Sequence, residues 1–250
     1  MVEISALLNR QIPYNNEVPI LNRDDIDRIS AEILRNYMPN VLASPMPINV
    51  EALIEKHFNL RLNFQSFSPD GSILGETIFA DGYREIFSLD EDSGFFQKQC
   101  ISVKRGMIFL DSAMVEQAET RTAFTEAHEL GHWILHGSFY GSCEKRACRS
   151  FLKQRLYFPH RTVMTPVQWT EWQANTFAAA LLLPKDALRI TLQNFLEDIK
   201  LDWKSLSDFS QYENRISYDK FLHIVAKTYM VSVETARLRM NKLCRISYPN

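Results

Sequence analysis

The stretch TEAHELGHWILH, residues 125–136, restricts what this chain can fold into more than any other feature. His128, Glu129 and His132 form the pattern H-E-x-x-H. On a helix, residues four apart lie one turn above each other on the same face, so both imidazoles can reach one metal ion. Glu129 lies beside His128 around such a helix, where it suits the role of general base rather than ligand. The stretch therefore predicts a metal-binding helix.

A catalytic zinc needs a third protein ligand and keeps its fourth position open. His136 continues the series, but it lies two turns from His128, ~12 Å along the axis, and cannot share a metal ion with both histidines on a straight helix. Two candidates remain, His160 in the stretch YFPHRT and Glu171 at the start of an alanine-rich helix. Asn175, one turn after Glu171, could hydrogen-bond the second ring nitrogen of a metal-bound histidine. The residues alone favour Glu171 and leave His160 open.

The competing interpretation is that H-E-x-x-H occurs by chance on a buried helix. The five-residue pattern is a modest signal by itself. It is followed, 39 residues after His132, by a second helical pattern that offers Glu171 and Asn175 on one face. This pairing favours the metal site.

Helical patterns, then strand patterns, then helical patterns follow one another along the chain, which is typical of the α+β class. A helix fits residues 24–37, with Asn22 and Asp25 as its cap. Strands fit residues 60–67 and 73–80, and residues 100–111 are expected to form a hairpin that turns at Arg105 and Gly106.

Two long helices are expected to carry the site. The first spans residues 114–136, with Gly137 as its stop, and the second spans residues 166–184 behind a capping box of Thr165 and Gln168. We therefore expect a small twisted β-sheet packed on the zinc-site helices. The expected domain limits are an irregular lead-in over residues 1–20, a domain over 21–186 that carries the metal site, and a C-terminal helical module over 187–250.

Composition narrows the class of protein further. The 250 residues are 46% hydrophobic and 23% charged, as in ordinary soluble proteins, and a net charge of −2 gives no polyanion-binding signature. The longest apolar run is far too short to span a bilayer, and the first ten residues lack the apolar run of a signal peptide. We therefore expect a cytoplasmic protein that does not bind membranes.

The cysteine pattern gives little more. Four cysteines are too few for a disulfide scaffold, so reduced thiols are expected. Cys143 and Cys148 have a spacing at the edge of the range for structural zinc, so a second zinc held with His136 or His160 is an alternative that we do not favour. Whether these two cysteines do more than pack stays open.

Two segments together resemble the ImmA/IrrE-type zinc metallopeptidase family. The segment from Arg121 to His132 matches the family pattern R-x-x-F-T-x-A-H-E-L-G-H. The segment from Glu171 to Pro184 matches E-x-x-A-N-x-F-A-x-x-L-L-M-P, with Leu183 where Met is usual. The resemblance covers roughly residues 25–245.

The resemblance implies a thermolysin-like site that holds one zinc ion per chain. The implied ligands are His128, His132 and Glu171, and the implied general base is Glu129. His136 is common at its position in the family and is expected to support the site without binding the metal. The implied function is that of a zinc-dependent endopeptidase that cleaves a specific partner protein, a helix-turn-helix repressor of a mobile element or stress response.

Peptide hydrolysis also needs a group that stabilises the oxyanion, and substrate must be held across the metal. The sequence does not choose among four candidates for the oxyanion: Tyr140, Tyr157, His160 and His223. Strand 107–111 is expected to be an exposed edge that pairs with the substrate backbone. The connection 137–164, with six basic residues and one acidic residue, is either a solvated face or a substrate-facing wall.

Residues 218–250 have helix-turn-helix spacing, with six basic and two acidic residues. We favour a structural or substrate-docking module over DNA contact, because the charge is modest and Met230 stands where such units often place Gly. The rival function is a non-catalytic, zinc-containing regulator that binds DNA or protein, including a toxin–antitoxin partner. Glu129 favours the enzyme, since an inert zinc site has no need of it.

Overall fold

The computed structural model describes residues 4–15, 18–90, 95–112, 119–142, 147–151, 164–208 and 211–244. The chain forms two compact units, of which the first contains Met1–Ile26 and Asn49–Ala178 and the second contains Asp27–Ile48 and Ala179–Asn250. Helices and small sheets make the fold α+β, as predicted, and the C-terminal part is helical. The domain limits expected at residues 20 and 186 stay predictions.

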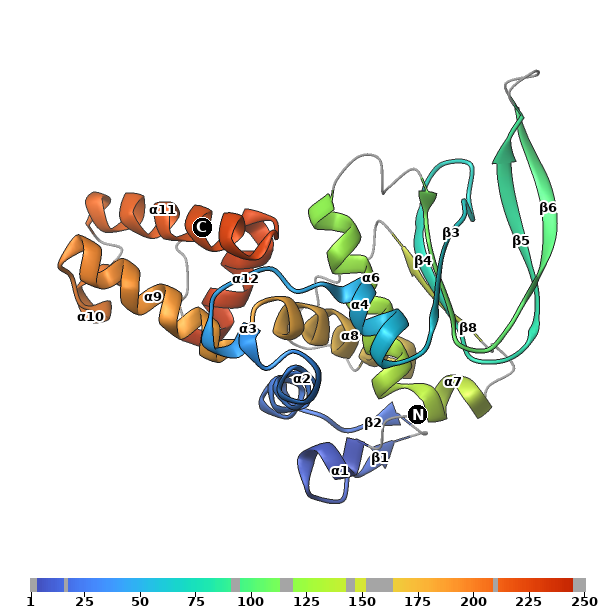
Figure 1. Ribbon diagram of the computed structural model, residues 1–250, viewed down its shortest axis with the longest axis horizontal. Coiled ribbons are helices and arrows are strands. Elements are labelled where there is room, and N and C mark those ends of the chain that lie inside the picture. Colours follow the sequence, from blue (N-terminus) through green and yellow to red (C-terminus); the bar gives the residue numbers. More distant parts are fainter. Residues whose placement is uncertain are drawn as a thin grey trace. The chain divides into compact units, whose positions relative to one another are not determined.

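A four-stranded sheet forms the centre of the first unit (Figure 1). Its order is β3 (Arg61–Phe64), β7 (Met107–Leu110), β4 (Ile73–Ile78) and β8 (Ala147–Phe151). Strands β3 and β7 are parallel, and β4 runs antiparallel to both of its neighbours. Strand β7 therefore lies inside the sheet, and the prediction that residues 107–111 form an exposed edge is wrong.

A separate hairpin is made by β5 (Gly82–Leu89) and β6 (Phe96–Val103) and extends past the four-stranded sheet (Figure 1). The hairpin predicted over residues 100–111 is wrong. A turn does form there, with the Met107 N–H donating to the Lys104 carbonyl at 3.1 Å, but β6 and β7 join different sheets. Ile108, Phe109 and Leu110 are all buried, so β7 needs neighbours on both edges, whereas β6 is mostly exposed.

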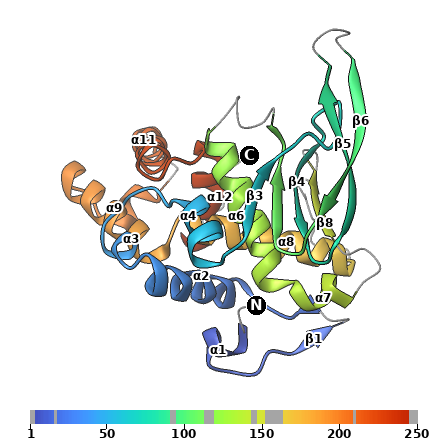
Figure 2. The ribbon, with the colours of Figure 1, turned by 45° about the vertical axis from the view of Figure 1, so that its right-hand side comes forward.

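Helix α6 (Glu119–Leu135) lies along one face of the four-stranded sheet, and the β5–β6 hairpin lies toward the other face (Figure 2). The hairpin side is filled by an apolar cluster of Phe67, Ile73, Ile78, Ile86, Val103 and Phe109. The predicted start of this helix, residues 114–118, lies outside the described residues. The metal-binding pattern is thus carried by a helix that the sheet supports along its length.

Helix α6 ends at Leu135, one residue before the predicted end, but Gly137 is not the left-handed cap that was expected. Its φ is not positive, and it begins the short helix α7 (Gly137–Ser142). The His136 N–H still donates to the His132 carbonyl at 2.9 Å, and the Tyr140 N–H donates to the His136 carbonyl at 3.0 Å. Helical hydrogen bonds therefore continue from α6 into α7, and the chain passes between the two helices without a left-handed residue.

Helix α8 (Pro166–Leu182) begins with the predicted capping box. The Thr165 N–H donates to Gln168 Oε1 at 2.9 Å, and the Gln168 N–H donates to Thr165 Oγ1 at 3.2 Å. These two bonds satisfy backbone donors that the first turn would otherwise leave without partners. The helix start is thereby fixed five residues before Glu171.

The first twenty residues, expected to be irregular, contain regular elements: α1 (Ile4–Leu8), β1 (Tyr14–Asn15) and β2 (Val18–Pro19). Val18 packs in a small apolar cluster with Phe79, Phe139 and Tyr140. Further along, α4 (Val50–Ala52) continues into a π-helical turn η1 (Leu53–His57), and Asn59, at φ +51°, follows its end.

The second unit is helical. It contains most of α2 (Arg23–Tyr37) and also α3 (Asn40–Ala43), α9 (Lys185–Ile199), α10 (Trp203–Leu206), α11 (Tyr212–Tyr229) and α12 (Val233–Cys244). The predicted cap of α2 is confirmed, since Asn22 and Asp25 exchange bonds of 2.9 and 3.1 Å. In the parts of the chain that the structure describes, no helix has the length and apolar character needed to span a bilayer.

Two basic residues of the C-terminal segment are engaged within this unit. Arg239 is buried and binds Asp27 at 2.7 Å and the Leu183 carbonyl at 3.2 Å. Arg237 pairs with Glu234 at 3.0 Å and Asp219 at 3.6 Å. Less of the positive charge of residues 218–250 is therefore available for phosphates than the sequence suggests, and DNA contact stays a prediction that we do not favour.

Candidate metal centre

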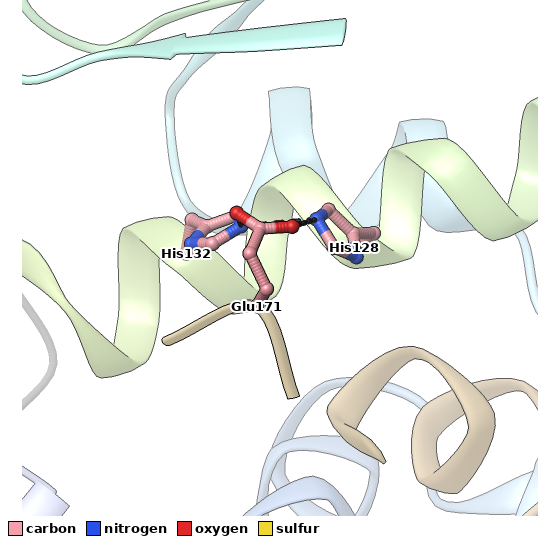
Figure 3. A group of neighbouring side chains, drawn as sticks. All are labelled: His128, His132 and Glu171. Atoms are coloured by element: carbon pink, nitrogen blue, oxygen red, sulfur yellow. Dashed lines mark hydrogen bonds and ion pairs between the residues drawn. The ribbon is translucent and has the colours of Figure 1, made fainter. Parts of the chain in front are cut away.

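Three buried side chains meet between helices α6 and α8. His128 and His132 project from consecutive turns of α6, and Glu171 reaches them from α8 (Figure 3). One donor atom from each of the three lies within 4.8 Å of the other two, so the group could hold a metal ion. The structure thus brings together both histidines of the pattern and one of the two candidates for the third ligand.

The two distances to Glu171 are close to those of a tetrahedral ion, whereas the two histidine nitrogens lie closer together than such an ion would hold them. The His128 and His132 Nε2 atoms are 2.9 Å apart, and they lie 3.4 and 3.2 Å from the two carboxylate oxygens of Glu171. Zinc bonds of about 2.0–2.2 Å to nitrogen and oxygen put tetrahedral ligand atoms about 3.3–3.5 Å apart. Two imidazole nitrogens and one carboxylate are also a donor set that zinc prefers.

Close packing of the two helices makes this meeting possible. A Cβ on Gly131 would lie 2.9 Å from Phe177 Cδ1 and 3.4 Å from Ala174 Cα. Any larger residue at position 131 would therefore push α8 away from α6. The glycine inside the H-E-L-G-H stretch and the alanine-rich face of α8 together set the helix spacing that lets Glu171 reach the histidines.

Strand β4 packs against the side chain of Glu129. The Thr77 hydroxyl donates to Glu129 Oε2 at 2.6 Å, and a Cβ on Gly75 would lie 2.7 Å from Glu129 Oε1. Gly75 and Thr77 are two residues apart on a strand, so both face α6. Thr77 and Glu129 are both buried. The strand thus leaves room for one carboxylate and supplies a hydrogen bond to it.

The ring nitrogens that point away from the cluster also have partners. His128 Nδ1 lies 3.1 Å from Asn175 Oδ1, the residue that the sequence suggested for this contact. His132 Nδ1 lies 3.0 Å from His136 Nδ1, and His136 Nε2 lies 3.0 Å from Gln173 Oε1. His136 therefore contacts a cluster histidine and not the cluster centre.

The two histidines and Glu171 shift one another's pKa values. Burial alone raises the pKa of Glu171, but the adjacent His132 and His128 outweigh burial and hold that pKa far below its ordinary value. Burial lowers the pKa of His128, but the hydrogen bond and charge of Glu171 leave it above its ordinary value. Burial, followed by the charge of His132, holds the pKa of His136 well below its ordinary value, which keeps that ring neutral.

The structure places two of the four oxyanion candidates, Tyr140 and His223. Tyr157 and His160 lie outside the described residues, so His160 is also untested as a ligand. Tyr140 is buried, with its hydroxyl 2.9 Å from Thr170 Oγ1, which itself donates to the Val167 carbonyl. With the Thr170 proton directed at Val167, the Thr170 oxygen is left to accept from the Tyr140 hydroxyl. His223 belongs to the second unit, where its Nδ1 bonds the Asp219 carbonyl of its own helix.

Much of the basic connection between the two metal helices lies outside the described residues, including Cys143. Arg149 is the basic residue of this connection that the structure describes. It stands opposite Glu76 in the β4–β8 register and binds that buried carboxylate at 3.2 Å, while Arg84 binds it at 2.7 Å. Arg149 therefore helps to hold the edge strand, and the idea of a basic substrate wall has no support from it.

Sequence reasoning missed Gly75, Thr77, Gln173 and Pro19 as parts of this site. The stretch ILGETI did place Gly and Thr on one face of a strand, which is a signal for a close approach to a neighbour. It did not say what that neighbour is. Gln173 stood inside the matched motif at a position that the family pattern leaves variable, so nothing marked it.

Comparison with known proteins agrees with the geometry. The sequence model of a peptidase family, described as the IrrE N-terminal-like domain, matches residues 87–241. This range contains α6 and α8 with all three cluster residues, and it excludes β3, β4 and the N-terminal elements. No curated protein matches the chain.

Proposed function

Because the chain belongs to the peptidase family of the IrrE N-terminal-like domain, we propose that it is a zinc-dependent endopeptidase that cleaves a specific partner protein. The observation that carries the proposal is the buried group of His128, His132 and Glu171, with Glu129 on the next position of the same helix. Three protein ligands and a neighbouring carboxylate are what metal-assisted hydrolysis requires.

Each residue has a defined part in this proposal. His128 and His132 offer Nε2 and Glu171 offers a carboxylate to one zinc ion, which when bound would lower the pKa of a water ligand to about 7 and polarise the substrate carbonyl. Glu129 accepts the proton of the attacking water and later gives it to the leaving amine. Thr77 holds the Glu129 carboxylate in place for both transfers.

The contacts that Gly75 and Thr77 of β4 make with Glu129 argue against an inert zinc site. A structural zinc is closed by four protein ligands and needs no base. Here strand β4 lacks a side chain at Gly75, where one would collide with Glu129, and provides a hydroxyl at Thr77 to bind it. We therefore prefer the enzyme over a zinc-containing regulator that binds DNA or protein.

Thr77→Val is expected to lower the turnover number roughly 10- to 100-fold without changing zinc content. A hydrogen bond to a charged group contributes about 1.5–3 kcal/mol, and valine keeps the shape of threonine while losing that bond. Thr77→Ser keeps the hydroxyl and should retain most activity. Initial rates on a fluorogenic peptide, with zinc measured on the same samples, test this. Equal turnover by Thr77→Val and wild type would reject the role of Thr77.

Asn175→Leu is expected to weaken zinc binding about 10- to 100-fold, the usual effect of removing a group that orients a metal-bound histidine. Asn175→Asp should be tolerated, since a carboxylate accepts the same bond from His128 Nδ1. Competition with a zinc-binding dye measures both affinities. If Asn175→Leu binds zinc as wild type does, the residue only packs between the helices.

Substrate backbone must lie extended across the metal, and pairing with a sheet edge is the simplest way to hold it. Since β7 is internal, we assign the pairing with the substrate backbone to β8, which lies next to β4, the strand that contacts Glu129. Among the described residues, no strand pairs with the outer edge of β8. Backbone pairing alone gives little sequence preference, so selectivity must come from other surfaces.

The proposed substrate is a helix-turn-helix repressor, cut at one exposed segment of the folded protein. The family resemblance supports this choice. Incubating the zinc-loaded protein with casein and with a candidate helix-turn-helix repressor should give cleavage of the repressor alone. Rapid digestion of casein with the repressor untouched would contradict selective docking, although the zinc chemistry would stand.

A further inference from the structure

Four buried polar groups form a series of hydrogen bonds that runs from the metal cluster to strand β2. His132 Nδ1 lies 3.0 Å from His136 Nδ1, and His136 Nε2 lies 3.0 Å from Gln173 Oε1. Gln173 Nε2 then donates to the carbonyl of Pro19 at 2.6 Å. The side chains of His132, His136 and Gln173 are fully buried.

The Pro19 carbonyl at one end and the metal-facing Nε2 of His132 at the other fix the directions of these hydrogen bonds. A carbonyl only accepts, so the Gln173 amide must turn its NH₂ to Pro19 and its oxygen to His136. His136 must then donate from Nε2 to the Gln173 oxygen. A His132 that offers its unprotonated Nε2 to the metal carries its proton on Nδ1, and His136 Nδ1, at 3.0 Å, is placed to accept it.

We propose that Gln173 is a positioning residue for the metal, which acts through His136 to hold His132 in its ligand tautomer and is itself oriented by the Pro19 carbonyl. The proposal rests on the zinc site proposed above. Zinc takes the unprotonated nitrogen of a neutral imidazole, so a ring already fixed in that tautomer binds without a proton shift.

The two cluster histidines are thus supported in different ways. His128 contacts Asn175, which comes from the same helix as Glu171. The support of His132 ends instead on strand β2, outside the range that matches the peptidase family. Pro19 and Gln173 are 154 residues apart in sequence, so this contact ties the first residues of the chain to the metal helices.

Gln173→Met tests the role of Gln173, because methionine has a similar length but cannot make either bond. Zinc affinity, measured by competition with a fluorescent chelator, should fall about 10- to 100-fold. Gln193→Met, on the exposed face of α9, is the matched control and should bind zinc as wild type does. A folded Gln173→Met variant with wild-type zinc affinity would overturn the proposal.

A second measurement needs no variant. Nitrogen-15 NMR of the histidine rings in the zinc-loaded wild type should show His136 protonated at Nε2 and unprotonated at Nδ1. A proton on His136 Nδ1 would overturn the relay even if Gln173→Met failed to fold. Neither measurement uses a peptide substrate. A protein that binds zinc and shows this tautomer but cleaves nothing would therefore contradict the peptidase function and leave the role of Gln173 supported.

Discussion

Glu129→Gln is expected to abolish peptide hydrolysis while zinc stays bound. The amide is nearly the same size as the carboxylate and can still accept the Thr77 hydrogen bond, but it cannot take a proton from water. Loss of a general base costs about 10²- to 10⁴-fold in rate. Cleavage rates on fluorogenic peptides and metal content should be measured on the same preparation.

Glu126→Gln is the matched control for this prediction. Glu126 is a buried carboxyl on the same helix, where burial and then the charge of Glu51 raise its pKa to about 7. Its replacement removes a carboxyl that has no part in the proposed chemistry, so activity should persist. Similar losses in Glu126→Gln and Glu129→Gln would mean that the helix tolerates no change here, and full activity in Glu129→Gln would exclude it as the base.

Glu171→Ala is expected to lose zinc altogether. Two neutral imidazoles remain after this change, whereas a catalytic zinc is held by three protein ligands. The loss of affinity should exceed the ~10- to 100-fold effect of changing a residue behind the ligands, such as Asn175. Metal analysis after dialysis against a weak chelator measures it, with the exposed Glu197→Ala on α9 as control. Full zinc retention in Glu171→Ala would remove Glu171 from the ligand set and return His160 to consideration.

The metal helix was predictable because its information is local. His128 and His132 share a face by helix geometry alone, and the capping bonds of Thr165 with Gln168 lie within one turn. Glu171 could be chosen over His160 only because it stood in a helical frame. Each of these predictions needed no knowledge of how distant segments meet.

The contacts that were missed are all long-range. Thr77 lies 52 residues before Glu129, and strand β4 pairs with β7 and β8 in an order that hydrophobic pattern does not specify. The turn at Gly106 was predicted correctly, but local sequence could not tell that β7 would enter the sheet between β3 and β4. Burial of Ile108, Phe109 and Leu110 decides that pairing, and burial is a property of the assembled unit.

The N-terminal residues also make a long-range contact that the sequence did not predict. Their prolines and polar residues predicted an irregular segment, yet the Pro19 carbonyl accepts a bond from Gln173 behind the metal cluster. A backbone carbonyl carries no mark in the sequence, so no motif could have pointed to it. Support of a metal site by main-chain groups has to be found in the structure.

Zinc titration of activity tests the central claim most directly. The wild-type protein should be stripped of metal with a chelator and then receive zinc in steps below and above one equivalent per chain, with cleavage of a fluorogenic peptide followed at each step. With the peptide as substrate, the account predicts no cleavage without zinc, a rise in rate with added zinc, and a plateau at one zinc per chain. Cleavage that persists in the stripped protein, or a plateau that depends on more than one zinc per chain, would contradict it.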